Sequence, residues 1–321
     1  MPTATPRRSR KLSIEALDLP APVVATPADA PPHHVRAALD LRLRALLTHD
    51  PGTRTGADIE DLHQMRVSVR RMRAALKAAR PLLDAAWADG LRTELGWLGG
   101  ALGPVRDLDV MILHLRAEVD VLPAAEQDAG GVLVDALETE RVAARTEMLA
   151  ALDAPRYPAL LERIADAVRL PLPTPTATQA QPELVDLIRA EARKMRKAVQ
   201  KAGPDPVDEV LHALRIHGKR VRYTGELVQP ALRGTPAGKA VKKLLRVTEE
   251  LQEVLGDHQD ACVAETRIRQ LLDGLADGPD GEIDAHVVFV GGRLVERERA
   301  RAEAKRAQWW AAWEQVAAVS V

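Results

Sequence analysis

Two short basic segments of this chain combine a histidine with closely spaced arginines and lysines. The first, HQMRVSVRRMR at residues 63–73, contains no acidic residue, and the next acidic residue along the chain is Asp84. Arginine offers a planar set of donors that can hold two phosphate oxygens, lysine adds a compact charge, and histidine donates one or two hydrogen bonds. Together these residue types suit the binding of an anion.

The second segment, HALRIHGKRVR at residues 212–222, aligns with the first without a gap at an offset of 149 residues. The alignment keeps a basic residue at five pairs of positions: His63/His212, Arg66/Arg215, Arg70/Lys219, Arg71/Arg220 and Arg73/Arg222. A second pair of motifs, LGPVRD at 102–107 and LGDHQD at 255–260, follows downstream in each half. Two motifs repeated in the same order indicate an internal repeat.

Helical spacing would place most of these basic side chains on one stripe in each half. At about 100° per residue, one arc of roughly 80° contains His63, Arg66, Arg70, Arg73 and Lys77, and the matching arc contains His212, Arg215, Lys219 and Arg222. A single arginine-rich helix is ordinarily a solvated face. Because the same residue types recur at the same spacing in both halves, we favour anion binding.

The elements that must position these stripes are helices. From Val35 onward apolar residues recur at spacings of three and four, and alternating strand-like runs are scarce, so we predict an all-α fold. The proline-rich stretch 170–182 divides it into a first half, about 32–169, and a second half, about 183–321. Residues 1–31 are also rich in proline and are predicted to be a disordered tail or linker outside the fold.

Composition limits the classes of protein to consider. The 45 Lys and Arg residues almost balance 46 Asp and Glu residues, so attraction to an anion must come from uneven placement of charge. The single cysteine, Cys262, excludes a disulfide framework and a cysteine-based zinc cluster, which fits a reducing cytoplasm. We find no apolar run of the roughly 20 residues that cross a bilayer and no signal peptide. The sequence therefore predicts a cytoplasmic protein without a membrane partner.

Other charged residues are candidates for supporting roles. Further cations in neighbouring segments supply the candidate ligands Arg193, Arg196 and Lys242. Asp107 and Asp260 follow glycines at which we expect one helix to end and the next to begin, so each either caps a helix or holds an arginine of the stripe in place. Glu226, at the position of Lys77 in the first half, either pairs with a nearby cation or closes one end of a groove.

These motifs carry a resemblance to a known family. The pattern H-x-x-R-V-x-x-R-R-x-R-x-x-L at 63–76, LGxxRDLDV at 102–110 and their second copies, HxxRIxxKRxRY at 212–223 and LGxxxD at 255–260, resemble the CHAD domain, the conserved histidine α-helical domain. The resemblance covers about residues 32–321. It implies two four-helix bundles related by pseudo-two-fold symmetry, with a basic groove that binds inorganic polyphosphate, and association with polyphosphate granules and their proteins in bacteria.

The resemblance also assigns roles to individual residues. It implies that the phosphate ligands are His63, Arg66, Arg70, Arg71 and Arg73 in the first half and His212, Arg215, Lys219, Arg220 and Arg222 in the second. The segment RRSRKLSIEALDLPAP near the N-terminus resembles the linker that follows a CYTH triphosphate-handling domain in two-domain relatives. This chain contains no CYTH domain, so we expect no triphosphatase activity.

Binding without turnover is the function that we expect. The chain lacks a phosphate-binding loop, a nucleophile elbow and an HExxH motif, and we predict no cofactor. His63 and His212 lack a second histidine or carboxylate at i+3 or i+4, so we predict no metal site.

Two other functions compete with polyphosphate binding. The composition disfavours nucleic acid as the ligand, because aromatic residues, which stack on bases, make up 2% of the chain. A structural helical adaptor is the other alternative, since Trp309, Trp310 and Trp313 lie on a helix that either binds a partner or packs on the second bundle.

Overall fold

The computed structural model describes residues 14–175, 182–277 and 283–321, and all its regular structure in these ranges is helical. This confirms the predicted all-α class. The helices of the first half are α1 (Pro31–Thr55), α2 (Ile59–Ala78), the short 3₁₀ helix η1 (Arg80–Leu82), α3 (Ala85–Asp120), α4 (Ala124–Asp153) and α5 (Arg156–Arg169). Those of the second half are α6 (Leu184–Ala202), α7 (Asp208–Val228), α8 (Pro236–Ala276), α9 (Ala285–Arg306) and α10 (Trp309–Ala317).

Capping residues define several of the helix ends. The side chain of Asp58 accepts a hydrogen bond from the backbone N–H of Glu60 at the start of α2, and Thr235 accepts one from Gly238 at the start of α8. Helix α1 ends at Thr55 and is followed by Gly56, whose φ of 70° lies in the left-handed region that glycine adopts without strain. These local signals fix where the basic helix α2 begins.

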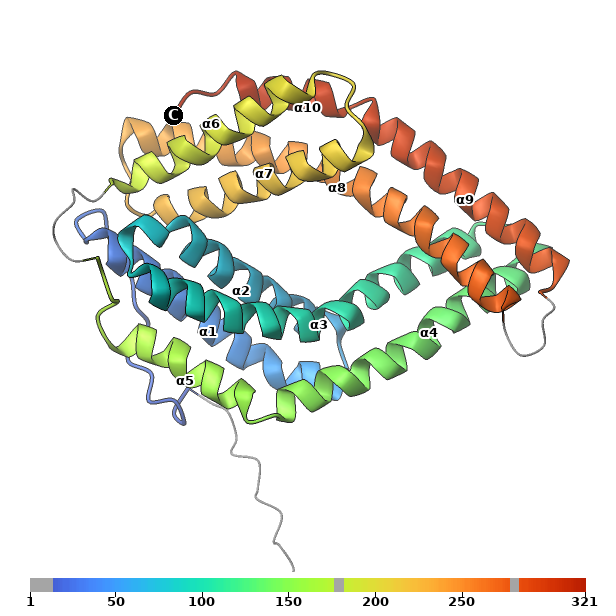
Figure 1. Ribbon diagram of the computed structural model, residues 1–321, viewed down its shortest axis with the longest axis horizontal. Helices are drawn as coiled ribbons and strands as arrows, with labels where there is room; N and C mark the ends of the chain where they lie inside the picture. Colours follow the sequence, from blue (N-terminus) through green and yellow to red (C-terminus); the bar gives the residue numbers. More distant parts are fainter. Residues whose placement is uncertain (1–13, 176–181, 278–282) are drawn as a thin grey trace, which may run out of the picture.

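The two longest helices, α3 and α8, continue through the glycines at which we expected helix boundaries. Gly103 and Gly256 lie in the interiors of these helices, so Asp107 and Asp260 cap nothing and the predicted boundaries are wrong. A glycine inside a helix costs about 1 kcal/mol relative to alanine, which favourable packing can offset. Pro104, also inside α3, removes one backbone hydrogen bond, and α3 bends near its middle (Figure 1).

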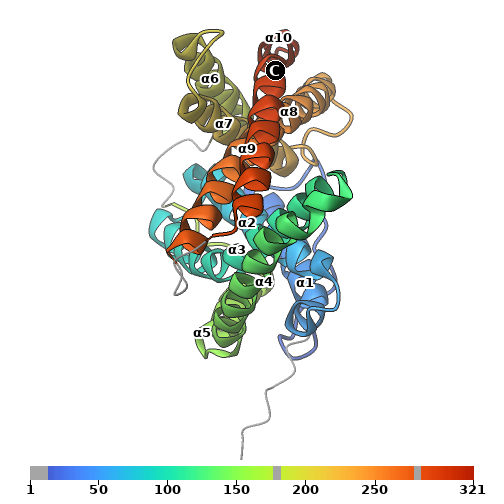
Figure 2. The same cartoon turned by 90° about the vertical axis from the view of Figure 1, so that its right-hand side faces the viewer.

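Successive helices pack on one another within each half and the halves meet at two places (Figure 1). In the first half α2 packs between α1 and α3, and in the second half α7 packs between α6 and α8. One contact between the halves joins α2 to α7, and another joins α4 to α9, where the red and green helices cross in Figure 2. The two basic helices are therefore neighbours at the junction of the halves.

Two hydrophobic clusters correspond to the two junctions. The larger one includes Met65 and Met72 of α2 together with Leu214 and Val221 of α7, all at most 2% exposed. The smaller cluster joins the far parts of α3, α4, α8 and α9, with Leu294 of α9 among its members. Because α3 and α8 contribute to both clusters, each links the basic junction to the opposite end of the molecule.

The N-terminal segment packs against the helices over its described part. Leu17 is 3% exposed and belongs to the larger hydrophobic cluster. The backbone N–H of Val23 donates to Asp40 over 2.8 Å, and Arg169 donates to the carbonyl oxygen of Leu17 over 2.7 Å. The prediction that residues 1–31 lie outside the fold is therefore wrong for residues 14–30, because an extended segment can bury apolar side chains without forming a helix. Residues 1–13 lie outside the described residues.

The proline-rich stretch predicted as a linker at 170–182 lies between α5 and α6. Leu172 is 7% exposed, and the carbonyl oxygen of Pro173 accepts a hydrogen bond of 2.8 Å from the backbone N–H of Asp84. The start of this stretch is thus held against the first half, while residues 176–181 lie outside the described residues.

The C-terminal helix packs on the second half. Trp309 and Trp313 are 2% and 7% exposed, α10 contacts α8, and the indole N–H of Trp309 donates to the carbonyl oxygen of Pro204 over 3.0 Å. The packing alternative for these tryptophans is confirmed. Across the described residues, every helix is too short or too polar to span a membrane.

Candidate functional site

The junction of α2 and α7 brings together basic residues from both halves. We use the name basic cluster for the following side chains of these two helices: His63, Arg66, Arg70, Arg71, Arg73, Lys77, His212, Arg215, Lys219, Arg220 and Arg222. Their helices are fixed by apolar residues on adjoining faces, since Met65 and Met72 are fully buried beside the basic stripe of α2. The packing of α2 on α7 therefore places two cationic surfaces next to each other.

Tyr223 marks the point at which the two stripes converge. The guanidinium carbon of Arg70, from the first half, lies 5.8 Å from the centroid of the Tyr223 ring. That of Arg222, from the second half, lies 5.6 Å from the same centroid. Tyr223 is 8% exposed, and such cation–π contacts are stronger where water is excluded. One buried ring thus holds arginines of both halves.

The pKa values of two lysines report a concentration of positive charge. The pKa of Lys219 is lowered to about 8 by burial and by the charges of Arg215 and of Arg70 in the other half. The pKa of Lys77 is also lowered, by burial and then by Arg220 of the second half. Protonated amines are disfavoured here first by burial and then by surrounding charges of the same sign, and a bound anion would relieve that repulsion.

Arg66 and Arg215 make the same contacts in the two halves. Arg66 forms an ion pair of 3.0 Å with Asp107, and Arg215 one of 3.8 Å with Asp260. Each arginine also passes over a glycine of the neighbouring long helix, Arg66 over Gly103 and Arg215 over Gly256. These contacts agree with the alternative in which the aspartates hold arginines in place.

Glu226 joins the halves through two arginines of the basic cluster. Its carboxylate lies 3.2 Å from Nε of Arg71 in the first half and 3.5 Å from Nε of Arg222 in the second. Arg222 also lies 3.4 Å from Glu249. The pairing alternative for Glu226 is confirmed, and the charges of Arg71 and Arg222 are partly neutralised.

Several cations of the basic cluster retain their charge without a carboxylate partner. Within the described residues no ion pair is formed by Arg70, Arg73, Lys77, Lys219 or Arg220. In addition, the Nε donors of Arg70 and Arg215 are buried without a hydrogen-bond partner in the described chain. Buried donors without partners are uncommon in proteins.

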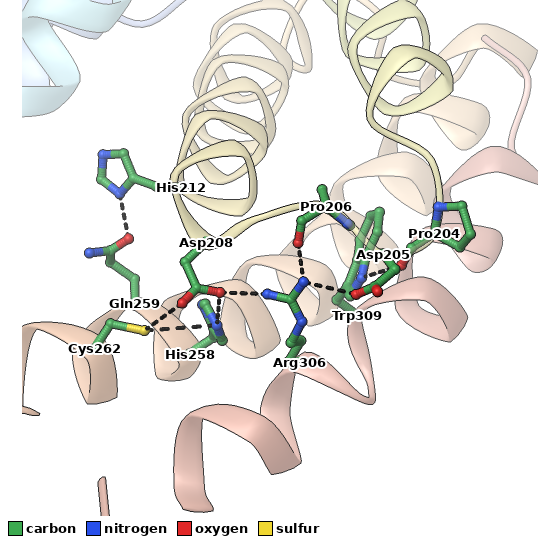
Figure 3. A network of polar contacts seen from close by, with 10 residues as sticks. All are labelled: Pro204, Asp205, Pro206, Asp208, His212, His258, Gln259, Cys262, Arg306 and Trp309. Carbon is green, nitrogen blue, oxygen red and sulfur yellow. Dashed lines mark hydrogen bonds and ion pairs between the residues drawn. The ribbon is translucent and has the colours of Figure 1, made fainter. Parts of the chain in front are cut away.

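The two motif histidines face the second motif of their own half. His212 Nδ1 lies 2.7 Å from Oε1 of Gln259, the residue that aligns with Arg106 (Figure 3). The pKa of His63 is lowered by burial and then by the charge of Arg106. No contact in the described chain joins His63 to His212, and His212 is hydrogen-bonded within its own half.

Three predicted ligands are not brought to the basic cluster by any contact in the described residues. Arg193 is exposed, Arg196 donates to the carbonyl oxygen of Val319 near the C-terminus, and Lys242 lines a surface cavity beside Arg233. Three cations that were not predicted as ligands also lie near the cluster. The charges of Arg92 and Lys194 lower the pKa of Lys77, and the charge of Arg106 lowers that of His63. Arg106 had a recognisable signal in the LGPVRD motif, and Lys194 belongs to the same basic segment as Arg193 and Arg196, whereas Arg92 had none.

Comparison with known families and sequences gives one family match. The CHAD domain model matches residues 37–269, nearly three quarters of the chain. Two curated proteins of Mycobacterium tuberculosis, the uncharacterized proteins MT2285 and Rv2226, are each 30% identical to the chain over 293 residues. The alignment covers 88% of this chain and 53% of each relative, so the chain spans about half the length of the curated relatives it matches.

Two solved structures share the fold. PptA from Streptomyces chartreusis has a TM-score of 0.68 at 23% identity, with 88% of this chain and 99% of that chain covered. The CHAD domain from the plant Ricinus communis has a TM-score of 0.68 at 24% identity, with 93% of this chain and 96% of that one covered. The helical arrangement described above is therefore one that these proteins also adopt.

Proposed function

Because this chain belongs to the CHAD domain family, we propose that it binds inorganic polyphosphate through the basic cluster at the junction of α2 and α7. The observation that carries this proposal is the convergence of Arg70 and Arg222, from different halves, on Tyr223. Like charges held this close favour a ligand that carries many negative charges. A polyphosphate chain supplies about one charge per unit along its length.

The geometry of the cluster suits a linear polyanion better than a single phosphate. The first stripe, from His63 to Lys77, extends about 21 Å along its helix, and the second, from His212 to Arg222, extends about 15 Å. Arg70, Lys219 and Arg220 have no carboxylate partner within the described chain, so binding need not first break an ion pair at these positions. In this proposal Asp107 and Asp260 orient Arg66 and Arg215 and reduce the entropy that is lost on binding.

We further propose that binding proceeds without turnover and attaches the protein to polyphosphate granules. The residues around the cluster are mainly cations, whereas phosphoryl transfer ordinarily uses magnesium held by acidic ligands or an activated nucleophile. Granule attachment requires only affinity for the polymer.

The test is calorimetry with polyphosphates of defined length on the intact protein and on the Arg66→Ala, Arg215→Ala double variant. We expect salt-sensitive binding to the intact protein, since neutralised phosphates release counterions. The double variant should lose at least about tenfold in affinity, or about 1.4 kcal/mol. These positions were chosen because they hold equivalent places in the two halves.

A matched control separates a site from general charge attraction. Arg116 and Arg293 pair with Glu138 and Glu126 at the opposite end of the molecule, so the Arg116→Ala, Arg293→Ala variant has the same net charge as the test variant. An equal loss in both variants would contradict the proposed site. Failure of long polyphosphate to displace single-stranded nucleic acid at equal phosphate concentration would contradict the proposed ligand.

A further inference from the structure

The start of α7 and the middle of α8 bring together an aspartate, a histidine and the one cysteine of the chain (Figure 3). His258 and Cys262 are four residues apart on α8 and so share one face of that helix. Asp208, the first residue of α7, faces them from the adjoining helix. The sequence did not indicate this grouping, because Asp208 lies 50 residues before His258.

The spacing of the three side chains fits a tetrahedral metal. His258 Nε2 lies 3.2 Å from Asp208 Oδ1, and Cys262 Sγ lies 3.8 Å from His258 Nε2 and 3.9 Å from Asp208 Oδ2. Zinc bonds of about 2.0 Å to oxygen and nitrogen and about 2.3 Å to sulfur separate tetrahedral ligands by about 3.3 to 3.6 Å. With one donor atom taken from each residue, all three lie within 4.8 Å of one another. The side chains would therefore have to move together by at most about 1.5 Å to surround one ion.

We propose that Asp208, His258 and Cys262 form a binding site for a divalent metal ion of the zinc class, distinct from the basic cluster. Thiolate, imidazole and carboxylate together are the donor set that zinc accepts. Binding converts the Cys262 thiol to a thiolate and releases one proton, while His258 coordinates through Nε2 with its proton on Nδ1. This proposal departs from the prediction that the chain has no metal site.

Neighbouring contacts hold Asp208 in position for this role. Arg306 at the end of α9 donates to Asp208 over 2.5 Å and to Asp205 over 2.8 Å, and it also bonds the carbonyl oxygen of Pro206 (Figure 3). The loop before α7 is thereby fixed against α9. Asp208 retains a second carboxylate oxygen toward Cys262.

The surroundings of the other two donors differ in their effect on metal binding. No arginine or lysine in the described part of the chain bonds to His258 or Cys262. His258 is 2% exposed, and burial lowers its pKa, which favours the neutral imidazole. Burial and then the charge of Asp208 raise the pKa of Cys262, so the metal itself must displace the thiol proton. In the other mixed group, His114, Glu118 and Glu298, both carboxylates also pair with arginines, as Asp208 does with Arg306, but that group has no cysteine.

Asp208 and Cys262 line an open cavity of about 670 Å³, to which His212 also contributes. A metal with three protein ligands and an open position exchanges water or a small anion there. The first half has no equivalent site, because the positions that align with Asp208, His258 and Cys262 are Ile59, Val105 and Asp109. The site is thus specific to the second half of the repeat.

The experiment titrates the reduced full-length protein with Co²⁺ and with Zn²⁺. We expect one ion per chain and a thiolate-to-cobalt charge-transfer band, which reports Cys262 alone because the chain has no other cysteine. The band should disappear in Cys262→Ser, and the affinity for Zn²⁺ should fall at least tenfold in His258→Ala and in Asp208→Asn. His286→Ala, which removes an exposed histidine at the start of α9, should bind as the intact protein does.

A second measurement uses the unaltered protein and does not depend on how the variants fold. Zn²⁺ at a concentration that saturates the site should slow alkylation of Cys262 at least tenfold, and a chelator should restore the original rate. Absence of the cobalt band, unchanged alkylation, or full Zn²⁺ affinity in Cys262→Ser would each overturn the proposal. Because no polyphosphate is present, these outcomes are independent of the proposed function.

Discussion

Lys219 carries a charge that changes with pH near neutrality, because its pKa is lowered to about 8. We expect polyphosphate affinity to fall as pH rises from about 7 to about 9, since Lys219 then loses its proton while the arginines stay charged. A bound polyanion favours the protonated amine, so binding near pH 8 should take up protons. Calorimetry in two buffers of different ionisation enthalpy measures this uptake.

The Lys219→Arg variant is the control for this prediction. Arginine remains protonated throughout the range, so the variant should bind with little dependence on pH, and an undiminished dependence would assign it to another group. The pH dependence of folding stability has the opposite sign to that of polyphosphate affinity. The unfolded chain, with the ordinary lysine pKa of 10.5, holds more protons than the folded chain above pH 8. The contribution of Lys219 to the free energy of unfolding therefore rises between these two pKa values.

At the residue scale, the sequence identified the donors better than their surroundings. The repeat of His, Arg and Lys at fixed spacing selected side chains that the structure places at one junction, among them Arg70 and Lys219. It did not separate Arg71, paired with Glu226, from Arg70, which has no carboxylate partner in the described chain. That difference depends on α7 lying against α2, a contact between segments far apart in sequence.

At the scale of helices, the passage of Arg66 over α3 depends on a glycine. A β-carbon at Gly103 would lie 2.6 Å from Nη1 of Arg66, whereas one at Gly256 would lie 3.7 Å from Nε of Arg215. We expect Gly103→Ala to displace Arg66 and weaken polyphosphate binding about fivefold, or about 1 kcal/mol. Gly256→Ala should leave binding unchanged and raise the free energy of unfolding by up to about 1 kcal/mol.

Calorimetry for binding and denaturant unfolding for stability distinguish the two glycine variants. Each is the control for the other, because both replace a glycine by alanine at equivalent positions of long helices. If both variants bind polyphosphate as the intact protein does, then the position of Arg66 over α3 does not matter for binding.

The sequence predicted the type of these helices more reliably than their ends. Apolar spacing of three and four is a local property, and it correctly indicated helix for α2 and α7. Glycine near a predicted end is ambiguous, since it also permits close approach of another chain segment. At Gly103 the approaching group is the guanidinium of Arg66, supplied by a helix that the local sequence does not reveal.

At the scale of the whole molecule, a chain of net charge −1 concentrates positive charge by pairing its acids elsewhere. Glu118, Glu126 and Glu138 bind arginines near the far junction, away from the basic cluster. Sequence composition reports only the sum of these charges. The repeat indicated two basic stripes, but only the packing of α2 on α7 places them side by side.

Glu226 joins the two halves inside the basic cluster, because it pairs with Arg71 of the first half and Arg222 of the second. Replacing it therefore tests whether the junction of α2 and α7 binds polyphosphate. We expect Glu226→Gln to raise polyphosphate affinity about threefold, because Arg71 and Arg222 lose a competing carboxylate, a gain of about 0.7 kcal/mol. The same change should lower the free energy of unfolding by about 1 kcal/mol, since a partly exposed ion pair contributes little more. Calorimetry and denaturant unfolding measure the two effects.

Glu250→Gln provides the matched control, because Glu250 pairs with Arg246 on the same helix and links nothing between the halves. It changes the net charge by the same amount, so general attraction of a polyanion should rise equally in both variants. A larger gain at Glu226 would come from the arginines that it releases at the junction. Equal gains in affinity would mean that polyphosphate responds to the total charge of the protein. That result would contradict the proposal that the junction of α2 and α7 is the binding site.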